Sequence, residues 1–367
     1  MIGSILLFFL VLSVLVLVHE FGHYWVAKKS GVWVEEFGLG LPPRAWGKMI
    51  GKTLYSINWL PFGGFVKLHG EDSSEEGHLH TEVAFSHKSK KKRAAIVTAG
   101  VVMNFLLAVV LFAVGYTFSG FPRETTNVKV VDIAKDSPAE VAGFQKDDIV
   151  KTVAGESATS NEGFVSLVEK HKGEDVDFGV ERGGQLMDIH ATPRKDHPSN
   201  EGSLGVVISS TEIYFPPVWQ RPFLGVYYGF KDAYFWGKIV LAGFGKIFTD
   251  LAGGTVPKDI AGPVGIYALT TQAASFGILS LLNFMGILSV NLAILNIMPL
   301  PALDGGRLLF ILIEGVMGKK VVPKFEAVVH TVGMIALLLL LFAITAYDIR
   351  RLIEAGGISN FLDFVSR

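Results

Sequence analysis

Four stretches of the chain are long and apolar enough to cross a lipid bilayer. They cover residues 2–27, 94–118, 276–300 and 327–346. The hydrocarbon core of a bilayer is about 30 Å thick and a helix rises about 1.5 Å per residue, so one crossing needs roughly 20 apolar residues. The pattern therefore predicts a polytopic α-helical membrane protein with four transmembrane helices.

The overall composition agrees with a membrane location. Half of the residues are hydrophobic, 18% are charged, and the formal net charge is −1. A net charge near zero gives no indication of nucleic-acid binding. The chain contains no cysteine, which excludes disulfides and thiolate ligands and leaves histidine and carboxylate for any zinc site.

The first apolar stretch leads directly into His19-Glu20-Phe21-Gly22-His23. Residues i and i+4 share one face of a helix, so His19 and His23 can bind one metal ion, with Glu20 beside them to take a proton from a water on the metal. A chance match at the end of a span is the alternative, but ionisable groups at membrane depth are costly and usually functional. A signal peptide is disfavoured because the segment lacks a basic start and a small-residue cleavage site.

The connection between the first two spans has the pattern of short strands. Residues 34–40 and 53–68 are typical of short strands with glycine and proline corners. We hypothesise a re-entrant β-loop at the active site, because extended backbone is tolerated at membrane depth where protein or a water-filled cavity satisfies it. Its free edge, with Gly63, Gly64 and Phe65, would pair with an extended substrate. A small cytosolic hairpin fits the sequence equally well.

Charge predicts the orientation of the spans. Five basic residues lie within residues 88–93, directly before the second span, and such clusters stay on the cytoplasmic side. The N-terminus is then extracytoplasmic, and His19 lies roughly 27 Å along the first helix, towards the cytoplasm. Arg350 and Arg351 beyond the fourth span oppose this orientation with fewer charges.

The third span ends in a helix-breaking segment followed by an aspartate. Asn291 and Asn296 precede Pro299 and Pro301, and Asp304 follows directly. The two prolines interrupt the helix, and the third span runs in the same direction as the first, so Asp304 reaches the depth of the two histidines. It either begins a cytoplasmic loop or completes a zinc site. We favour the ligand, because an open zinc site needs a third protein ligand.

The spans flank a region of different character. Charges and short alternating runs return at 122–211, which predicts an extracytoplasmic α+β domain, with a helix that starts at Ser137 as N-cap and Pro138. Within 212–275, residues 214–250 are rich in aromatics and predict an interfacial amphipathic helix rather than a fifth span. A turn rich in glycine and proline follows at 259–266. The chain thus divides at 1–121, 122–211, 212–275 and 276–367.

Residues 137–150 closely resemble the S-P-A-x-x-A-G-x-x-x-G-D-x-I stretch of PDZ domains, with Asp147 where that family usually has glycine. The resemblance implies that the domain binds a peptide or a chain terminus by strand addition. The binding residues would be Leu204, Gly205 and Val206. A domain that acts only as a steric plug is the alternative.

Together, the motifs resemble the bacterial site-2 proteases of the regulator-of-sigma-E type, which are zinc intramembrane metalloproteases. The motifs that carry this resemblance are H-E-F-G-H in the first span, N-x-x-P-x-P-x-L-D-G-G in the third, and the PDZ-like insert. Ala99 to Asn104 matches the family's A-G-P-x-x-N except that Val101 replaces proline, and residues 262–265 match its G-P-x-G. The single PDZ-like domain differs from members that carry two.

The resemblance implies roles for the motif residues. His19, His23 and Asp304 would bind one Zn²⁺, and Glu20 would be the general base and acid. The two asparagines would hydrogen-bond the substrate backbone or the oxyanion, and the two prolines would shape that segment. These residues are Asn291, Asn296, Pro299 and Pro301.

It also implies substrates and a location: single-pass membrane proteins such as anti-sigma factors or remnant signal peptides, cleaved in the bacterial inner membrane during regulated intramembrane proteolysis. Two other classes stay open. A membrane-anchored protease would cleave water-soluble unfolded proteins. A non-enzymatic adaptor or transporter would not need the metal ligands.

Overall fold

The computed structural model describes residues 2–71, 81–198, 201–253, 262–318 and 322–355. The chain forms two compact units. The first combines Met1–Phe118 with Trp219–Arg367, and the second is Ser119–Val218, which we call the inserted domain. The predicted boundaries of that domain, 122–211, lie inside it.

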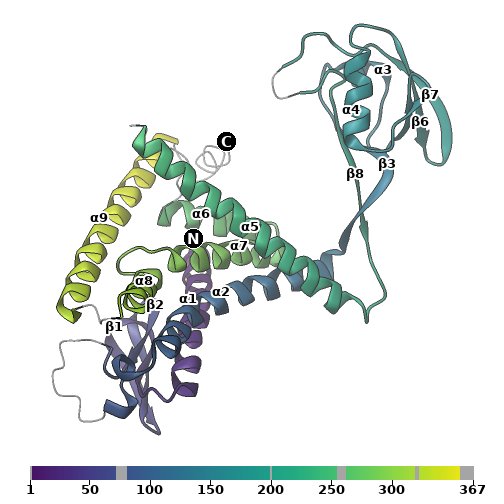
Figure 1. The fold of residues 1–367 in the computed structure, drawn as a ribbon. Coiled ribbons are helices and arrows are strands. Elements are labelled where there is room, and N and C mark those ends of the chain that lie inside the picture. Colours follow the sequence, from purple (N-terminus) through teal and green to yellow (C-terminus); the bar gives the residue numbers. More distant parts are fainter. Residues whose placement is uncertain (1, 72–80, 199–200, 254–261, 319–321, 356–367) are drawn as a thin grey trace. The chain divides into compact units, whose positions relative to one another are not determined.

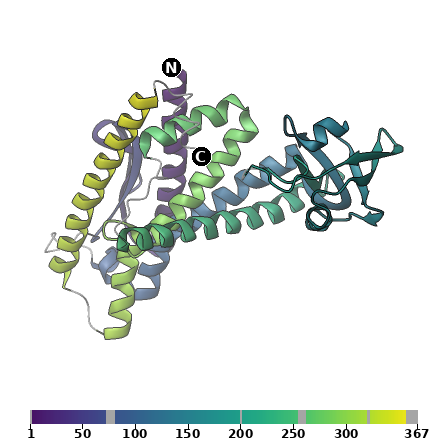
Figure 2. The same cartoon turned by 90° about the horizontal axis from the view of Figure 1, so that it is seen from above.

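Seven helices are described in the first unit, and four of them are long and apolar enough to span a membrane (Figures 1 and 2). This matches the number of spans that the hydrophobic pattern predicts. The four are α1 (Ile2–Lys29), α2 (Lys90–Ser119), α7 (Ile278–Ile297) and α9 (Pro323–Ala355). The others are α5 (Arg221–Ala252), α6 (Pro263–Ser275) and α8 (Asp304–Met317), and two short 3-10 turns cover Thr81–Val83 and Phe85–His87.

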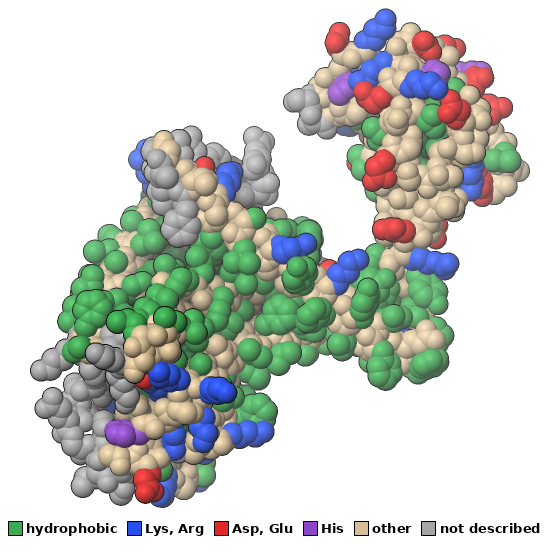
Figure 3. Space-filling model, in the orientation of Figure 1, with side chains coloured by type: hydrophobic (Ala, Val, Ile, Leu, Met, Phe, Trp, Pro, Cys, Tyr) green, Lys and Arg blue, Asp and Glu red, His purple; other side chains and the backbone are tan. Residues whose placement is uncertain are grey.

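Apolar side chains of α1, α2 and α7 form the core of this helical unit. Leu15 of α1 packs with Leu111 of α2 and Met285 of α7, and Gly286 leaves room for the ring of Phe112. The outer surface is also apolar: hydrophobic side chains cover the visible face of the helices, whereas charged side chains are frequent on the inserted domain (Figure 3). An apolar exterior suits contact with lipid.

The predicted strands form one antiparallel sheet of two long strands, β1 (Val34–Ile50) and β2 (Thr53–Leu68). The first part of β1 pairs on one side with residues 64–67 of β2 and on the other with residues 54–57. The second part of β1 pairs only with the beginning of β2. Gly40 and Gly63 have φ of 80° and 82° where the strands change direction. Residues 64–67 therefore form one edge of the sheet.

The segment after the inserted domain contains a long helix, as predicted, but its contacts are more specific than an amphipathic pattern indicates. Helix α5 buries small residues at four-residue intervals, Gly225, Gly229, Ala233 and Gly237. A Cβ at Gly225 would lie 2.8 Å from the carbonyl oxygen of Ala113 in α2. The stripe thus lets α5 approach the spanning helices closely.

The predicted Gly-Pro turn is only partly described, and the described part is different. Residues 259–261 lie outside the described residues. Gly262 is the N-cap of α6, and Pro263 is its first residue, so the prediction of a turn at 262–265 is wrong. Proline is favourable at a first helical position because its fixed φ suits the helix and its missing N–H would have no partner there. The carboxylate of Asp348 in α9 accepts the N–H of Gly265 at 2.9 Å.

The inserted domain is an antiparallel sheet with two helices. The strand order is β7-β6-β4-β3-β8, with β5 paired to β4. The strands are β3 (Phe121–Ile133), β4 (Ile149–Val153), β5 (Glu156–Ser157), β6 (Val176–Arg182), β7 (Gln185–Ala191) and β8 (Val206–Tyr214), and the helices are α3 (Pro138–Ala142) and α4 (Asn161–Lys170). One edge of the sheet is β8, the strand that follows the predicted peptide-binding residues.

Two details of the inserted domain bear on its sequence motif. Ser137 caps α3 by accepting the N–H of Glu140, as predicted. Asp147 has φ of 75°, which explains the usual glycine at this position, since few other residues adopt left-handed backbone and aspartate tolerates it. The next residue, Asp148, is buried and pairs with Arg182 at 2.7 Å.

Candidate metal and active site

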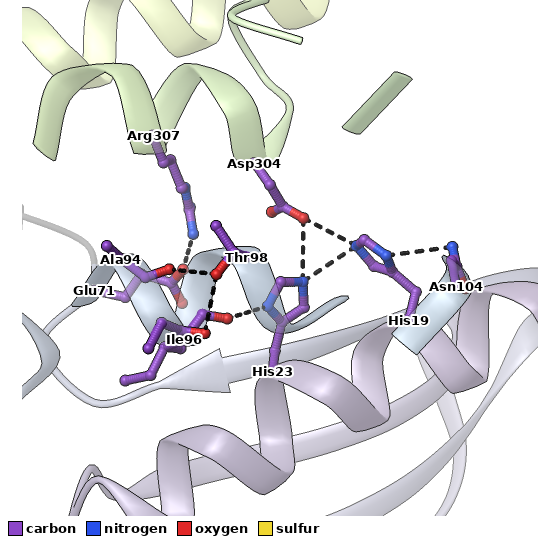
Figure 4. Close-up of polar contacts among 10 residues, drawn as sticks. His19, His23, Glu71, Ala94, Ile96, Thr98, Asn104, Asp304 and Arg307 are labelled. Atoms are coloured by element: carbon purple, nitrogen blue, oxygen red, sulfur yellow. Dashed lines mark hydrogen bonds and ion pairs between the residues drawn. The ribbon is translucent and has the colours of Figure 1, made fainter. Parts of the chain in front are cut away.

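Three side chains from two distant parts of the chain meet at one point (Figure 4). Oδ2 of Asp304 lies 3.0 Å from Nε2 of His19 and 3.2 Å from Nε2 of His23. The two Nε2 atoms are 3.1 Å apart. His19 and His23 lie one turn apart on α1, and Asp304 is the first residue of α8.

The geometry of this triad fits a tetrahedral zinc ion. Zinc binds histidine nitrogen and carboxylate oxygen at about 2.0–2.2 Å, which places two ligand atoms roughly 3.3 Å apart. The three observed separations are close to that value. Oδ2 of Asp304 is also buried without a hydrogen-bond donor among the described residues, so a cation would satisfy it. His19, His23 and Asp304 therefore fit three protein ligands with a fourth position open.

The far side of each imidazole faces helix α2. Nδ1 of His23 donates to the carbonyl oxygen of Ile96 at 2.8 Å, which leaves Nε2 free to bind metal. The side-chain amide of Asn104 lies 3.4 Å from Nδ1 of His19. Asn104 is fully buried, and its main-chain oxygen accepts a hydrogen bond from Ser289 of α7 at 2.7 Å.

Two glycines allow α1 and α2 to pack closely enough for these contacts. A Cβ at Gly100 would clash with Nε2 of His23 and would lie 2.6 Å from Cε1 of His19. A Cβ at Gly22, between the two histidines, would lie 2.5 Å from the carbonyl oxygen of Ala99. Only glycine fits at these positions without moving the metal ligands.

Asp304 is delivered by a sharp turn between α7 and α8. Helix α7 ends at Ile297, and the chain turns through residues 298–303 before α8 begins. Ala302 has φ of 71°. A Cβ at Gly305 would meet the carbonyl oxygen of Met298, and one at Gly306 that of Leu300. The two glycines after Asp304 are therefore needed for α8 to fold back against the turn.

A cavity of about 220 Å³ opens beside the triad. Glu20 lines it together with His19 and Asp304, which places the predicted general base next to the metal position. Asn104 and Asn296 line it from α2 and α7, and the remaining walls come from Val16, Leu292, Ala302 and Leu303. The sequence contained Asn104 in the A-G-V-V-M-N stretch, but helical periodicity alone did not show that its side chain faces a histidine.

The edge of the β-sheet formed by residues 64–67 lies against the active-site helix. A Cβ at Gly64 would be 3.5 Å from Cγ of Glu20 and 3.5 Å from Cγ1 of Val16. The Glu20 carboxylate also lies near the backbone of Val66. The sheet and the general base are thus in direct contact.

The other residues predicted to bind substrate have different surroundings. Asn291 donates its side-chain amide to Ile287 of its own helix at 2.9 Å, and it does not line the cavity. Pro299 is exposed. Pro301 packs against Gly333 of α9, Gly63 faces Leu41, and the ring of Phe65 packs over Gly38.

Ion pairs and a hydrogen bond join α8 to its neighbours. Arg93 of α2 pairs with Glu314 of α8, and their side chains are only 12% and 9% exposed. Nζ of Lys90 donates to the main-chain oxygen of Glu314 at 2.8 Å. Arg307 of α8 pairs with Glu71, which follows β2 (Figure 4). These pairs connect the helix that begins with Asp304 to both α2 and the β-sheet.

In the inserted domain, the residues predicted to bind peptide form a tight turn before β8. Leu204 is buried, Gly205 has φ of 78°, and Val206 begins the strand. The preceding Ser203 donates to Glu169 of α4 at 2.7 Å. Hydrogen bonds from Lys172 and Ser203 hold the pKa of Glu169 below its ordinary value.

Residues 7–340 match the model of peptidase family M50. The chain is 30% identical to zinc metalloprotease RasP of Oceanobacillus iheyensis, over 95% of this chain and 99% of that protein. It is 33% identical to a putative zinc metalloprotease of Clostridium perfringens, over 93% and 96% of the two chains. The regulator of sigma-W protease RasP of Bacillus subtilis is 27% identical, over 96% and 99%. The PDZ domain of an SdrC-like protein from Listeria innocua matches 24% of this chain and 99% of its own at 19% identity, with a TM-score of 0.21.

Proposed function

The chain belongs to peptidase family M50 and is a metalloprotease, and from this premise we propose that it is an intramembrane endopeptidase. It uses one zinc ion per chain to cleave the transmembrane segments of single-pass membrane proteins. The observation that carries this proposal is the position of the triad. His19 and His23 lie near the end of a spanning helix, and Asp304 follows directly after another.

The residues around the cavity supply the steps of peptide hydrolysis. His19, His23 and Asp304 would hold the metal, which when bound acts as a Lewis acid on the scissile carbonyl and on the attacking water. Glu20 takes the proton of that water and then gives it to the leaving amine. Asn104 and Asn296 line the same cavity, and the side-chain amide of Asn296 could donate a hydrogen bond to a developing oxyanion there.

The substrate must present an extended segment to these groups, because a helix hides its amides in internal hydrogen bonds. Residues 64–67 form a sheet edge that touches Glu20. We infer that the unwound substrate adds to this edge as a further strand. The substrate-binding residues would then include Gly63, Gly64 and Phe65. Substrates with glycine or other weak helix formers near the scissile bond would unwind most readily.

Location and orientation follow from charge. The basic cluster at residues 88–93 would lie on the cytoplasmic side of a bacterial inner membrane. The N-terminus and the inserted domain would then be extracytoplasmic, and the zinc site would lie towards the cytoplasm. The Bacillus subtilis relative is named as a regulator of sigma-W protease, which supports an anti-sigma factor as the substrate class; remnant signal peptides are a second class.

We propose that the inserted domain is a PDZ domain that binds an extended peptide or chain terminus along β8. Two observations support this. Strand β8 is an edge of its sheet, and the turn formed by Leu204 and Gly205 directly precedes it. Glu169 lies beside this turn through Ser203, and its negative charge would disfavour a free carboxylate compared with an internal segment.

The test compares Glu20→Gln with the unchanged protein in proteoliposomes containing a single-pass membrane substrate. We expect Glu20→Gln to retain zinc and to lose about 10²–10⁴-fold in cleavage rate, because only the proton carrier is removed. Glu124→Gln is the control, since Glu124 is exposed on β3. Undiminished cleavage by Glu20→Gln would overturn the mechanism, and activity unaffected by a chelator would overturn the metal assignment.

A further inference from the structure

His330, on the fourth spanning helix α9, contacts the turn that precedes Asp304. Nδ1 of His330 accepts the backbone N–H of Ala302 at a distance of 3.0 Å. Ala302 is two residues before Asp304 and also lines the catalytic cavity. Helix α9 carries none of His19, His23 and Asp304, but this hydrogen bond connects it to the turn that precedes Asp304.

This hydrogen bond is important because Ala302 has an unfavourable backbone conformation. Its φ of 71° lies in the left-handed region, where the Cβ of an L-residue crowds the following carbonyl group. Residues in this region persist where their surroundings fix them. If Ala302 relaxed to a negative φ, the direction of the chain would change two residues before Asp304, and the carboxylate would leave the two histidines.

The ring of His330 is itself well fixed. It packs against Phe310 of α8 with ring centroids 5.7 Å apart, and a Cβ at Gly306 would lie 3.3 Å from its Cε1. Gly333, one turn further along α9, admits Pro301 against the helix. His330 and Gly333 therefore present one face of α9 to both ends of the short Pro301-Ala302 segment.

The hydrogen bond also determines the form of the ring. Because Nδ1 accepts a hydrogen bond, the proton of the neutral ring is on Nε2. Nε2 is buried and has no hydrogen-bond partner among the described residues. The contribution of His330 is thus one directed hydrogen bond at Nδ1 together with apolar packing of the ring.

We propose that His330 is a positioning residue of the zinc site: it holds Ala302 in the left-handed conformation that aims Asp304 at His19 and His23. This rests on the proposed zinc site. Residues behind metal ligands typically change metal affinity or activity by about 10–100-fold when they are replaced. His330 likewise does not touch the metal position. It acts on the backbone of Ala302, two residues before the ligand Asp304.

The first test measures the zinc dissociation constant by competition with a chelator, without substrate. We expect His330→Ala to weaken zinc binding by about 10–100-fold. We expect His330→Asn to retain most of the affinity, because an asparagine oxygen can replace Nδ1 as acceptor. The control is Thr331→Val, because the hydroxyl of Thr331 donates within its own helix, to the main-chain oxygen of Ala327 at 2.8 Å. Equal loss in His330→Ala and His330→Asn, or loss in neither, would overturn the proposal.

A second test separates positioning from general loss of packing. Glycine adopts a positive φ readily, so His330→Ala should weaken zinc binding less when Ala302 is also replaced by glycine. Equal losses in the two backgrounds would contradict the role assigned to Ala302. Both tests read zinc affinity alone, so a protein that binds zinc as described but fails to cut a transmembrane segment would refute the proposed function and leave this inference standing.

Discussion

At the scale of single residues, the site depends on close contacts that leave no space between α1 and α2. The ring of His23 is fixed by the carbonyl of Ile96, and both histidines lie where a side chain at Gly100 would be. A zinc site tolerates little displacement of its ligands, because the distances to the metal vary by only about 0.2 Å. The glycine is therefore part of the metal site although it has no group that binds metal.

We predict that Gly100→Ala weakens zinc binding by at least about 10-fold, because the added methyl displaces His19 and His23 from the metal. Gly115→Ala is the matched control, since it lies on the same helix and its Cβ would meet nothing within 4 Å. Zinc affinity measured by chelator competition decides between them. Equal affinities in the two variants would show that the contact at Gly100 is not limiting.

The sequence predicted which three residues would meet better than it predicted the residues that support them. His19 and His23 follow from helical spacing, and Asp304 follows from counting the directions of the spans. Asn104 and His330 could not be assigned in this way, because their roles depend on which residue of another helix they face. An asparagine or histidine within an apolar helix indicates only that some polar partner is near.

At the scale of elements, helix α8 is the piece that must be held in register. It begins with Asp304, and it is tied to α2 by the buried Arg93–Glu314 pair and to the sheet by the Arg307–Glu71 pair. Removing one partner of a buried pair is strongly destabilising, because the remaining charge is left without compensation.

We predict that Glu314→Gln lowers the free energy of unfolding by roughly 3 kcal/mol, because Arg93 stays buried without its partner. Glu354→Gln, which breaks the exposed pair with Arg350, should change it by less than about 1 kcal/mol. Denaturant unfolding of the purified protein in detergent measures both. Equal small changes would mean that the buried pair contributes no more than a surface pair.

The sequence predicted which segments are helices and strands better than it predicted how they pair, where they begin and how they pack. Short runs with glycine and proline corners indicated strands at 34–40 and 53–68, but the double pairing of residues 36–39 requires a register that such a pattern does not determine. Glycine and proline at 262–265 predicted a turn, whereas they begin α6, because the same residues are suited to a turn and to a helix start. In α5 the small residues at every fourth position indicate close helix packing, and aromatic content alone did not reveal it.

At the scale of the whole molecule, His19, His23 and Asp304 belong to the compact unit that contains the four helices long and apolar enough to span a membrane. The hydrophobic pattern predicted the number of spans because length and apolarity are set by the bilayer itself. Sidedness depends on a modest excess of basic residues, so it needs a direct measurement.

The absence of cysteine makes that measurement simple. Single cysteines can be introduced at Gln185, exposed on β7, and at Lys91, exposed near the start of α2. We predict that a membrane-impermeant maleimide labels Gln185→Cys in intact cells and labels Lys91→Cys only after permeabilisation. The reverse pattern would place the inserted domain in the cytoplasm and would overturn the proposed orientation.

The central claim is that peptide bonds within the membrane are cut at the His19–His23–Asp304 site. The measurement that tests it most directly is mass spectrometry of the products formed from a single-pass substrate in proteoliposomes. The account predicts new chain termini inside the hydrophobic segment of the substrate, formed by the unchanged protein and absent with Glu20→Gln. Termini found only in the water-exposed flanks of the substrate would contradict it.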